Sequence, residues 1–415
     1  MPKVSRLRLL RAGSIPFIKP QPGEQPAGRL ASSLEVPSVR KVVIDGRILG
    51  YRYGGIATYA RQLALRIPRL TSNLNLSIAL RRQVLEFADR SLQTLTPPHH
   101  RFERELFGLE ITARQPDLVH SVDYVTPVAR GPKTVATVHD LAFLDHPELV
   151  TADSYAYYSQ IHDALPTTDR VIAVSPATRD RLIERFNLQP ERVTMIPNGY
   201  DDATFQPEVC NDMRLIGERS PFLARAIRDE RPIVLAVGTV EPRKRYEILV
   251  DALENHRAEI CRLAGTEPVV VIAGQSGWLS DELVARMRHQ ATQGRLVWIR
   301  DCVNDELAAL YRQAKLLVMP SIDEGFGLPV LEAMASGTPS LVANTGALPW
   351  LVADSGFIED TDVASAWAEK IGMILADNEV RQLRGKRGIS RAATFTWDET
   401  ARQTAKLYEE VMNER

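Results

Sequence analysis

The sequence contains little cysteine, no long apolar run and almost no net charge, and each absence excludes a class of protein. Cys210, Cys261 and Cys302 are odd in number and widely spaced, which fits neither a disulfide framework nor a metal site. No apolar run approaches the roughly 20 residues of a membrane-spanning helix, and the start lacks the apolar segment of a secretion signal. With 51 basic and 52 acidic side chains, no global field attracts nucleic acid. We therefore expect a cytoplasmic protein without a nucleic-acid partner.

The first 41 residues differ from the rest in composition. They carry eight basic side chains and six prolines, with Glu24 and Glu35 as their acids. Such a composition is typical of a disordered leader. Because apolar residues alternate with Arg6, Arg8 and Arg11, a second interpretation is peripheral contact with anionic lipid at the inner face of the membrane. Both interpretations concern residues 1–38.

The remaining chain alternates short Val/Ile-rich runs with helical-period stretches, and a length of 415 residues predicts two domains. Continuous apolar runs followed by helices indicate parallel sheets covered on both faces. The first series of runs is 42–45, 76–80, 117–121, 133–140, 170–175 and 193–199. The second is 232–238, 269–274, 296–301, 316–321, 339–344 and 356–360. We therefore predict an α/β fold with two doubly wound domains, at 39–215 and 216–394, and a terminal helix within 395–415.

The most informative segment is EGFGLPVLE, residues 324–332, which directly follows the predicted strand 316–321. Pro329 suits the first turn of a helix. We expect the free amides of residues 328–331 to face an anion, with Glu332 in the first turn and Glu324 in the preceding loop. Two carboxylates flanking a phosphate site, both bordering a solvent-filled cleft, would suit the hydroxyls of a nucleotide sugar.

Two other interpretations of these acids remain open. Glu332 could simply favour the helix dipole, by about 0.3–1 kcal/mol, but this leaves Glu324 and the two glycines unexplained. The pair could also be the acid and base of a glycosidase, although a strand–loop–helix turn is an unusual place for such a pair.

Two further loops follow predicted strands. The loop after 42–45 holds Gly54 and Gly55, which let backbone approach a ligand but which also occur in plain turns. It is not a Gly-x-Gly-x-x-Gly motif, so a nicotinamide fingerprint is absent. The loop after 232–238 holds Arg243, Lys244 and Arg245, which suit a diphosphate or form a solvated charge run.

At these residues the chain resembles the retaining glycosyltransferases of family 4, which have the GT-B fold of two facing Rossmann-like domains with a cleft between them. The similarity covers roughly residues 40–412. Its segments are PSIDEGFGLPVLEAMASGTP, GTVEPRKR, IPNGYDDATF, TVHDLAFLDHPE and GGIATYARQL. One departure is Trp350, where the family often has an acid, and this puts local packing or acceptor contacts in question.

The resemblance implies a role for each matching residue. Glu324 would orient the donor sugar, Glu332 would hold the ribose, and His139 would lie near the transferred sugar. The implied catalytic residues are Glu324, His139, Arg243 and Lys244. The implied donor-binding residues are Gly54, Gly55, Arg243, Lys244, Phe326, Gly327, Leu328 and Glu332, with Pro329 near the phosphates and no metal ligand.

The resemblance further implies transfer of a sugar from a nucleotide diphosphate sugar to a saccharide or lipid-linked acceptor in cell-surface polysaccharide synthesis. GDP-mannose is the first expected donor, with UDP-, dTDP- and other GDP-sugars as alternatives. We identify no Asp-x-Asp motif of metal-dependent transferases and expect no cofactor or metal. A GT-B nucleotide-sugar epimerase and a binding-only homologue are the rival classes; the first would need no acceptor, and the second would lack the donor residues.

Overall fold

The computed structural model describes residues 39–50, 54–208 and 211–414. Val39–Arg415 forms one compact unit. The leader hypothesis for residues 1–38 concerns residues outside the described ranges, as does the part of the Gly54 loop at 51–53.

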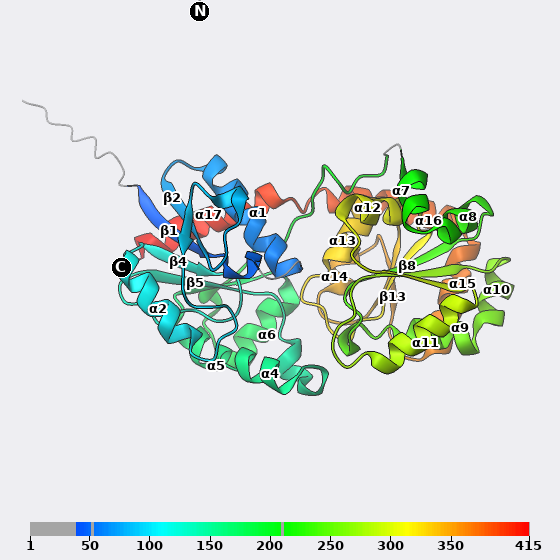
Figure 1. The fold of residues 1–415 in the computed structure, drawn as a ribbon, viewed down its shortest axis with the longest axis horizontal. Helices are drawn as coiled ribbons and strands as arrows, with labels where there is room; N and C mark the ends of the chain where they lie inside the picture. Colours follow the sequence, from blue (N-terminus) through cyan, green and yellow to red (C-terminus); the bar gives the residue numbers. More distant parts are fainter. Residues whose placement is uncertain (1–38, 51–53, 209–210, 415) are drawn as a thin grey trace, which may run out of the picture. The chain divides into compact units, whose positions relative to one another are not determined.

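The first half of the chain builds a parallel sheet in the order β3-β2-β1-β4-β5-β6-β7 (Figure 1). Its strands are β1 Arg40–Asp45, β2 Leu74–Leu80, β3 Ser91–Gln93, β4 Leu118–Ser121, β5 Lys133–Val138, β6 Arg170–Ala173 and β7 Val193–Met195. Asp45 of β1 lies opposite Ser121 of β4, which lies opposite Ala136 of β5. The loops that leave these three strands therefore emerge side by side at one edge of the sheet.

Helices connect the strands of the first sheet. They are α1 Gly55–Leu70, α2 Glu103–Arg114, α3 Ala142–Asp145, α4 Ala152–Tyr158, α5 Ile161–Ala164 and α6 Pro176–Phe186. The start of α6 shows local sequence control, because the Ser175 side chain accepts a hydrogen bond from the Thr178 amide and Pro176 occupies the first turn.

The second half builds another parallel sheet in the order β10-β9-β8-β11-β12-β13. Its strands are β8 Ile233–Val237, β9 Val269–Ala273, β10 Leu296–Ile299, β11 Leu316–Met319, β12 Ser340–Ala343 and β13 Phe357–Glu359. Its helices are α9 Glu247–Asn255, α10 Arg257–Ala264, α11 Asp281–Thr292, α12 Asn304–Gln313, α13 Leu328–Ala335, α14 Leu348–Val352, α15 Ala364–Ala376 and α16 Asn378–Ala392. The order reverses between β8 and β11, which is where ligands bind in sheets of this kind.

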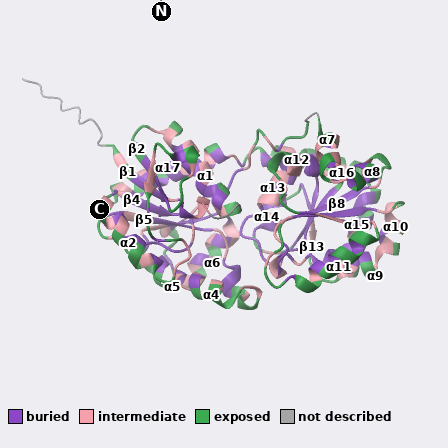
Figure 2. Cartoon of the chain, viewed as in Figure 1, coloured by how far each residue is buried: buried purple, intermediate pink, exposed green. Residues whose placement is uncertain are grey.

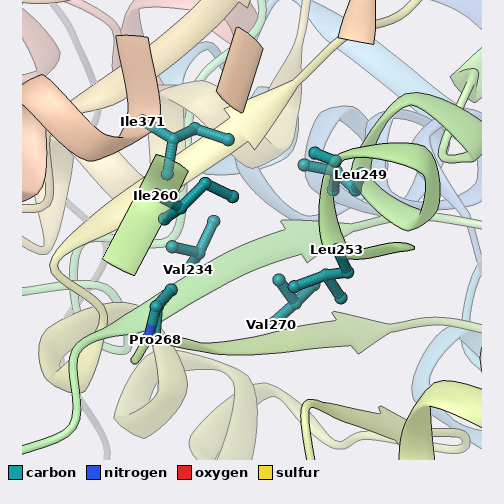
Figure 3. A pocket seen from close by; sticks show the side chains of 8 residues that line it. Val234, Leu249, Leu253, Ile260, Pro268, Val270 and Ile371 are labelled. Atoms are coloured by element: carbon teal, nitrogen blue, oxygen red, sulfur yellow. The ribbon is translucent and has the colours of Figure 1, made fainter. Parts of the chain in front are cut away.

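Both sheets are buried on both faces, as the continuous apolar runs predict (Figure 2). On one face of the second sheet, α9, α10 and α15 enclose a small apolar cavity between Val234, Val270, Leu253 and Ile371 (Figure 3). None of its eight lining residues carries a polar side chain, so this cavity is a packing feature of the core.

Four elements depart from the sequence analysis or extend it. Strand β3 and the helices α7 Asp212–Arg219 and α8 Pro221–Arg228 were not predicted. The terminal helix α17, Trp397–Asn413, packs against α1, and Trp397 and Tyr408 join the core of the first sheet. Within the described ranges, no helix is both long and apolar enough to cross a membrane.

Candidate active site

Two loops meet at the carboxyl edge of the second sheet, one after β8 and one after β11. The Ile322 amide donates to the Arg243 carbonyl at 2.9 Å, and Arg243 Nη1 donates to the Asp323 carbonyl at 2.9 Å. Arg245, in the left-handed region at φ 52°, donates from Nε to the Pro320 carbonyl at 2.9 Å. The basic run is thus a built part of the site and not a solvated charge run.

Glu324 is the best-anchored side chain of the site and is 7% exposed. Its Oε1 accepts hydrogen bonds from Lys244 Nζ at 2.5 Å and from Ser321 Oγ at 2.8 Å. Its Oε2 lies 3.3 Å from Arg243 Nη1. Burial alone would raise the pKa of Glu324, but Lys244 and Arg243 lower it to about 2. The carboxylate is therefore ionised at all ordinary pH values. The expectation that it borders a solvent-filled cleft is wrong for Glu324, because the two cations enclose it.

The two cations are also positioned by neighbouring acids. Arg243 Nη2 donates to Glu241 Oε1 at 3.0 Å. Lys244 is buried at the end of the short helix Pro242–Lys244 in the loop after β8, and its acid partner is Glu324. The sequence analysis missed Ser321 and Glu241, which fix Glu324 and Arg243. Both residues stand within the segments GTVEPRKR and PSIDEGFGLPVLEAMASGTP, but nothing in the sequence shows which side chains they contact.

Helix α13 begins directly after this loop. Gly327 precedes it with φ 99°, a conformation that favours glycine, and Pro329 lies in the first turn. The expectation of free amides at residues 328–331 is partly wrong. The Val330 and Leu331 amides donate to the Gly327 carbonyl at 2.9 and 3.1 Å, and Pro329 has no amide hydrogen.

Glu332 lies one position later than expected, beyond the first turn of α13. Its Oε2 accepts a hydrogen bond from the Tyr311 hydroxyl of α12 at 2.9 Å. Burial raises the pKa of Glu332 to about 7, and Asp201 adds to this effect, whereas the bond from Tyr311 opposes it. The two acids of the motif therefore differ electrostatically: Glu324 stays ionised, whereas Glu332 titrates near neutral pH.

Gly325 lies against the carbonyl of His139, in the loop after β5. A Cβ atom built on Gly325 would lie 1.6 Å from the His139 oxygen, so no other residue fits without moving backbone. Thr178 Oγ1 donates to the Gly325 carbonyl at 3.4 Å, and Arg181 Nη1 donates to Asp323 Oδ2 at 2.8 Å. These contacts bring His139 and the EGFGLPVLE segment together.

His139 is neutral and its ring is fixed. Burial lowers its pKa, and Nε2 lies 2.9 Å from the Val122 carbonyl, so Nε2 carries the proton in that bond. The ring packs edge-on against Tyr59, with centroids 5.1 Å apart. His120, by contrast, is a core residue bonded to Thr137 and Tyr408, and burial lowers its pKa to about 3.

The remaining candidate residues lie beside this centre. Gly54 directly precedes α1 and Gly55 begins it, and a Cβ on Gly55 would lie 3.4 Å from Leu328 Cδ1. The Phe326 side chain is in the core, 4% exposed, so only its backbone is available to a ligand. Trp350 packs against Phe326 with centroids 6.2 Å apart. Its departure from the family pattern is therefore accommodated by packing within this domain.

No group of three His, Cys, Asp or Glu side chains among the described residues is placed to hold a metal ion. The statement that the sequence has no Asp-x-Asp motif needs correction, because Asp360-Thr361-Asp362 follows β13. Asp360 accepts from Asn344 Nδ2 at 2.7 Å, and Asp362 is exposed 3.8 Å from Arg245 Nη1. Asn344, Asp360 and Asp362 are exposed.

Two doubly wound sheets, with paired cations and a Glu-x7-Glu segment at the order reversal of the second, define a glycosyltransferase of the GT-B fold. Residues 222–391 match the sequence profile described as "Glycosyl transferases group 1", and residues 53–204 match "Glycosyltransferase Family 4". The chain belongs to family 4 of the glycosyltransferases.

Two curated relatives illustrate the range of this similarity. A D-inositol 3-phosphate glycosyltransferase of Salinispora tropica is 31% identical over 72% of this chain and 64% of its own length. The matched part thus spans less than two thirds of that relative. An O-antigen chain mannosyltransferase B of Escherichia coli is 28% identical over 70% of this chain and 74% of its own length.

Solved structures show the same fold. A sucrose-phosphate synthase from Thermosynechococcus elongatus has a TM-score of 0.69 at 22% identity, covering 89% of this chain and 98% of its own. Anabaena HepE, in complex with UDP-glucose, has a TM-score of 0.67 at 16% identity, covering 89% and 99%.

Proposed function

We infer that this chain transfers a sugar, with retention, from a nucleotide diphosphate sugar to a hydroxyl of a saccharide or lipid-linked acceptor in cell-surface polysaccharide synthesis. The observation that carries this proposal is the ionised Glu324, held between Lys244 and Arg243 directly before α13. A nucleotide-sugar site needs this combination of cations for the diphosphate and a charged acceptor for sugar hydroxyls.

The proposed chemistry follows from these charges. As the bond between sugar and diphosphate breaks, negative charge grows on the departing phosphate, and Arg243 and Lys244 stabilise it. When the diphosphate draws Arg243 and Lys244 away from Glu324, which they enclose in the free protein, its carboxylate accepts hydrogen bonds from the sugar and keeps the sugar's reacting face toward the acceptor. The acceptor hydroxyl attacks on the face that the diphosphate leaves, and its proton passes to the leaving phosphate. The backbone carbonyl of His139 lies against Gly325 of this loop.

GDP-mannose is the proposed first donor. The name of the Escherichia coli relative, a mannosyltransferase, supports mannose. The UDP-glucose complex of the Anabaena protein makes a uridine sugar the second candidate. The alternative function, that of a nucleotide-sugar epimerase, would release its product without any acceptor.

A thermal-shift screen of the full chain against GDP-mannose, UDP-glucose, GDP-fucose and dTDP-rhamnose tests the donor. We expect the largest shift with GDP-mannose. A shift with a uridine or thymidine sugar alone would overturn the donor assignment and leave the transferase class in place. The best donor is then incubated with and without lipid-linked saccharides. Release of an isomerised product in the incubation without acceptor would instead indicate an epimerase.

A further inference from the structure

One cation of the first half of the chain reaches the loop that carries Glu324. Arg181 lies in the middle of α6, and its guanidinium pairs with two acids. Nη1 donates to Asp323 Oδ2 at 2.8 Å, and Nη2 donates to Asp145 Oδ2, at the end of α3. Asp323 directly precedes Glu324 in the loop after β11. A single side chain therefore connects an acid of each half of the chain.

Asp323 is the buried end of this connection. It is 5% exposed, whereas the side chains of Arg181 and Asp145 are partly exposed. Its Oδ1 lies against the loop after β12, where a Cβ built on Gly346 would lie 2.6 Å from it. An exposed ion pair contributes little, but a buried carboxylate that loses its cation is costly. The pairing with Arg181 is therefore important for this loop.

The backbone of Asp323 belongs to the donor centre. Its carbonyl accepts from Arg243 Nη1 at 2.9 Å, and the same nitrogen lies 3.3 Å from Glu324 Oε2. The following carbonyl, that of Glu324, accepts from the Ala347 amide at 2.8 Å. A displacement of Asp323 would therefore move the atoms that place Arg243 and the Glu324 carboxylate.

Arg181 also offsets negative charge in this region. Burial raises the pKa of Asp323, Arg181 opposes this effect, and the carboxylates of Asp140 and Glu324 raise the pKa further. Asp140 belongs to the loop after β5, and its Cβ would lie 2.9 Å from a Cβ built on Gly325. Without Arg181, Asp323 would be a buried acid beside two other acids, and we expect the loop to shift to relieve this repulsion.

We propose that Arg181 is a positioning residue for sugar transfer: it fixes the loop that carries Glu324 by pairing with Asp323, and it acts through this pair and not by contact with either substrate. This inference rests on the proposed transferase function. It makes the transfer step depend on an ion pair that joins the two halves of the chain at the start of the EGFGLPVLE segment.

The pair matters most once the donor is bound. In the free protein, Lys244 and Arg243 enclose the Glu324 carboxylate. When the diphosphate engages these two cations, the contacts that hold Glu324 weaken, and the bond from Arg181 to Asp323 still holds its loop. The cations themselves do not depend on Arg181 for binding the diphosphate. Loss of Arg181 should therefore lower turnover and leave diphosphate affinity unchanged.

The test uses variants of the full chain. Arg181→Met removes the cation, and Asp323→Asn removes the buried charge while it keeps the shape of the side chain. The matched control is Arg185→Met. Arg185 lies one turn later on α6 and also pairs with Asp145, but its other bond is to the Leu144 carbonyl, so both partners belong to the first half. The double variant of Arg181 and Asp323 completes a mutant cycle.

Titration calorimetry measures the affinity for the nucleoside diphosphate, and steady-state transfer to a lipid-linked saccharide measures kcat and KM. Because a bond to a charged group is lost, Arg181→Met should lower kcat at least about tenfold relative to Arg185→Met. The diphosphate should bind both variants equally. Asp323→Asn should lower kcat as well, and adding Arg181→Met to it should cause no further loss. If Arg181→Met does not fold, the comparison of Asp323→Asn with Arg185→Met decides.

Three results would overturn the positioning role while transfer by the parent protein keeps the proposed function intact. They are equal kcat in Arg185→Met and in the variants that break the pair, an undiminished further loss when Arg181→Met is added to Asp323→Asn, and a loss that appears only in diphosphate affinity. Absence of transfer by the parent protein from every nucleotide sugar in the screen would overturn both proposals.

Discussion

Replacing Glu324 by glutamine removes the charge that two buried or partly buried cations share. The pKa of Glu324 is about 2 instead of its ordinary 4.5, and that difference corresponds to about 3 kcal/mol. Because folding lowers the pKa of this acid, the stabilisation is fully present above pH 4.5 and is lost as the pH falls toward 2. At neutral pH, Glu324→Gln should therefore lower the free energy of unfolding by about 3 kcal/mol. At about 2–4 °C per kcal/mol, its Tm should fall by about 6–12 °C.

A double-mutant cycle with Lys244→Met isolates the pair. The Lys244 ammonium donates to Glu324 at 2.5 Å, and a cation left buried without its partner is more costly than the loss of both groups. Scanning calorimetry at pH 7 should show that the double variant loses less stability than the sum of the losses in the two single variants. The same Glu324→Gln protein should bind a nucleoside diphosphate at least as tightly as the parent, because its cations are released. An unchanged Tm in Glu324→Gln, or strictly additive effects in the cycle, would refute the electrostatic account of this site.

Three further predictions follow from the same geometry. Glu332→Gln should leave stability unchanged at about pH 4 but raise it at pH 8 by at most about 3 kcal/mol, because folding raises the pKa of this acid from 4.5 to about 7 and the folded chain is therefore destabilised progressively as the pH rises from 4.5 to 7. If Glu332 holds the ribose, calorimetry should also show that the diphosphate affinity of the parent rises from pH 6 to 8, whereas that of Glu332→Gln stays constant. A constant affinity in the parent would show that this role is wrong. Gly325→Ala should lower both Tm and transfer, because its Cβ would meet the His139 carbonyl at 1.6 Å. Gly217→Ala in α7, whose Cβ would lie 3.8 Å from its nearest neighbour, should lower neither. Equal behaviour of the two variants would contradict the close approach. Transfer should persist in excess EDTA, and activity lost there but restored by magnesium or manganese would show that a metal, and not Arg243 with Lys244, neutralises the leaving group.

The sheets were predictable because their strands are local patterns. VVVIA in β9 and LLVM in β11 are continuous apolar runs, which buried parallel strands require. Strand β3, SLQ, has three residues and one apolar side chain, so no period identifies it. Helices α7 and α8 lie in a stretch where the sequence showed few periodic signals, although Ser220 caps α8 and Pro221 lies in its first turn.

The site was predictable only where its residues are close in sequence. Gly327 and Pro329 mark the start of α13, as expected from their backbone preferences. The Lys244–Glu324 ion pair joins residues 80 positions apart, and only the tertiary fold shows that the two side chains are paired. For the same reason, the sequence does not show that Asp45, Glu103 and Asp123 lie close together, since they belong to three separate segments.

The central claim is that this site transfers a sugar with retention and that Glu324 acts in the transfer step. The most direct measurement follows turnover of the best nucleotide sugar with a neutral glycoside acceptor, using ¹H NMR to identify the anomeric configuration of the product. Our account predicts that the product keeps the donor's configuration, and that Glu324→Gln binds the nucleoside diphosphate yet turns over at least about a hundredfold more slowly than the control Glu105→Gln, which changes an exposed acid on α2. A product of inverted configuration, or parental turnover by Glu324→Gln, would contradict it.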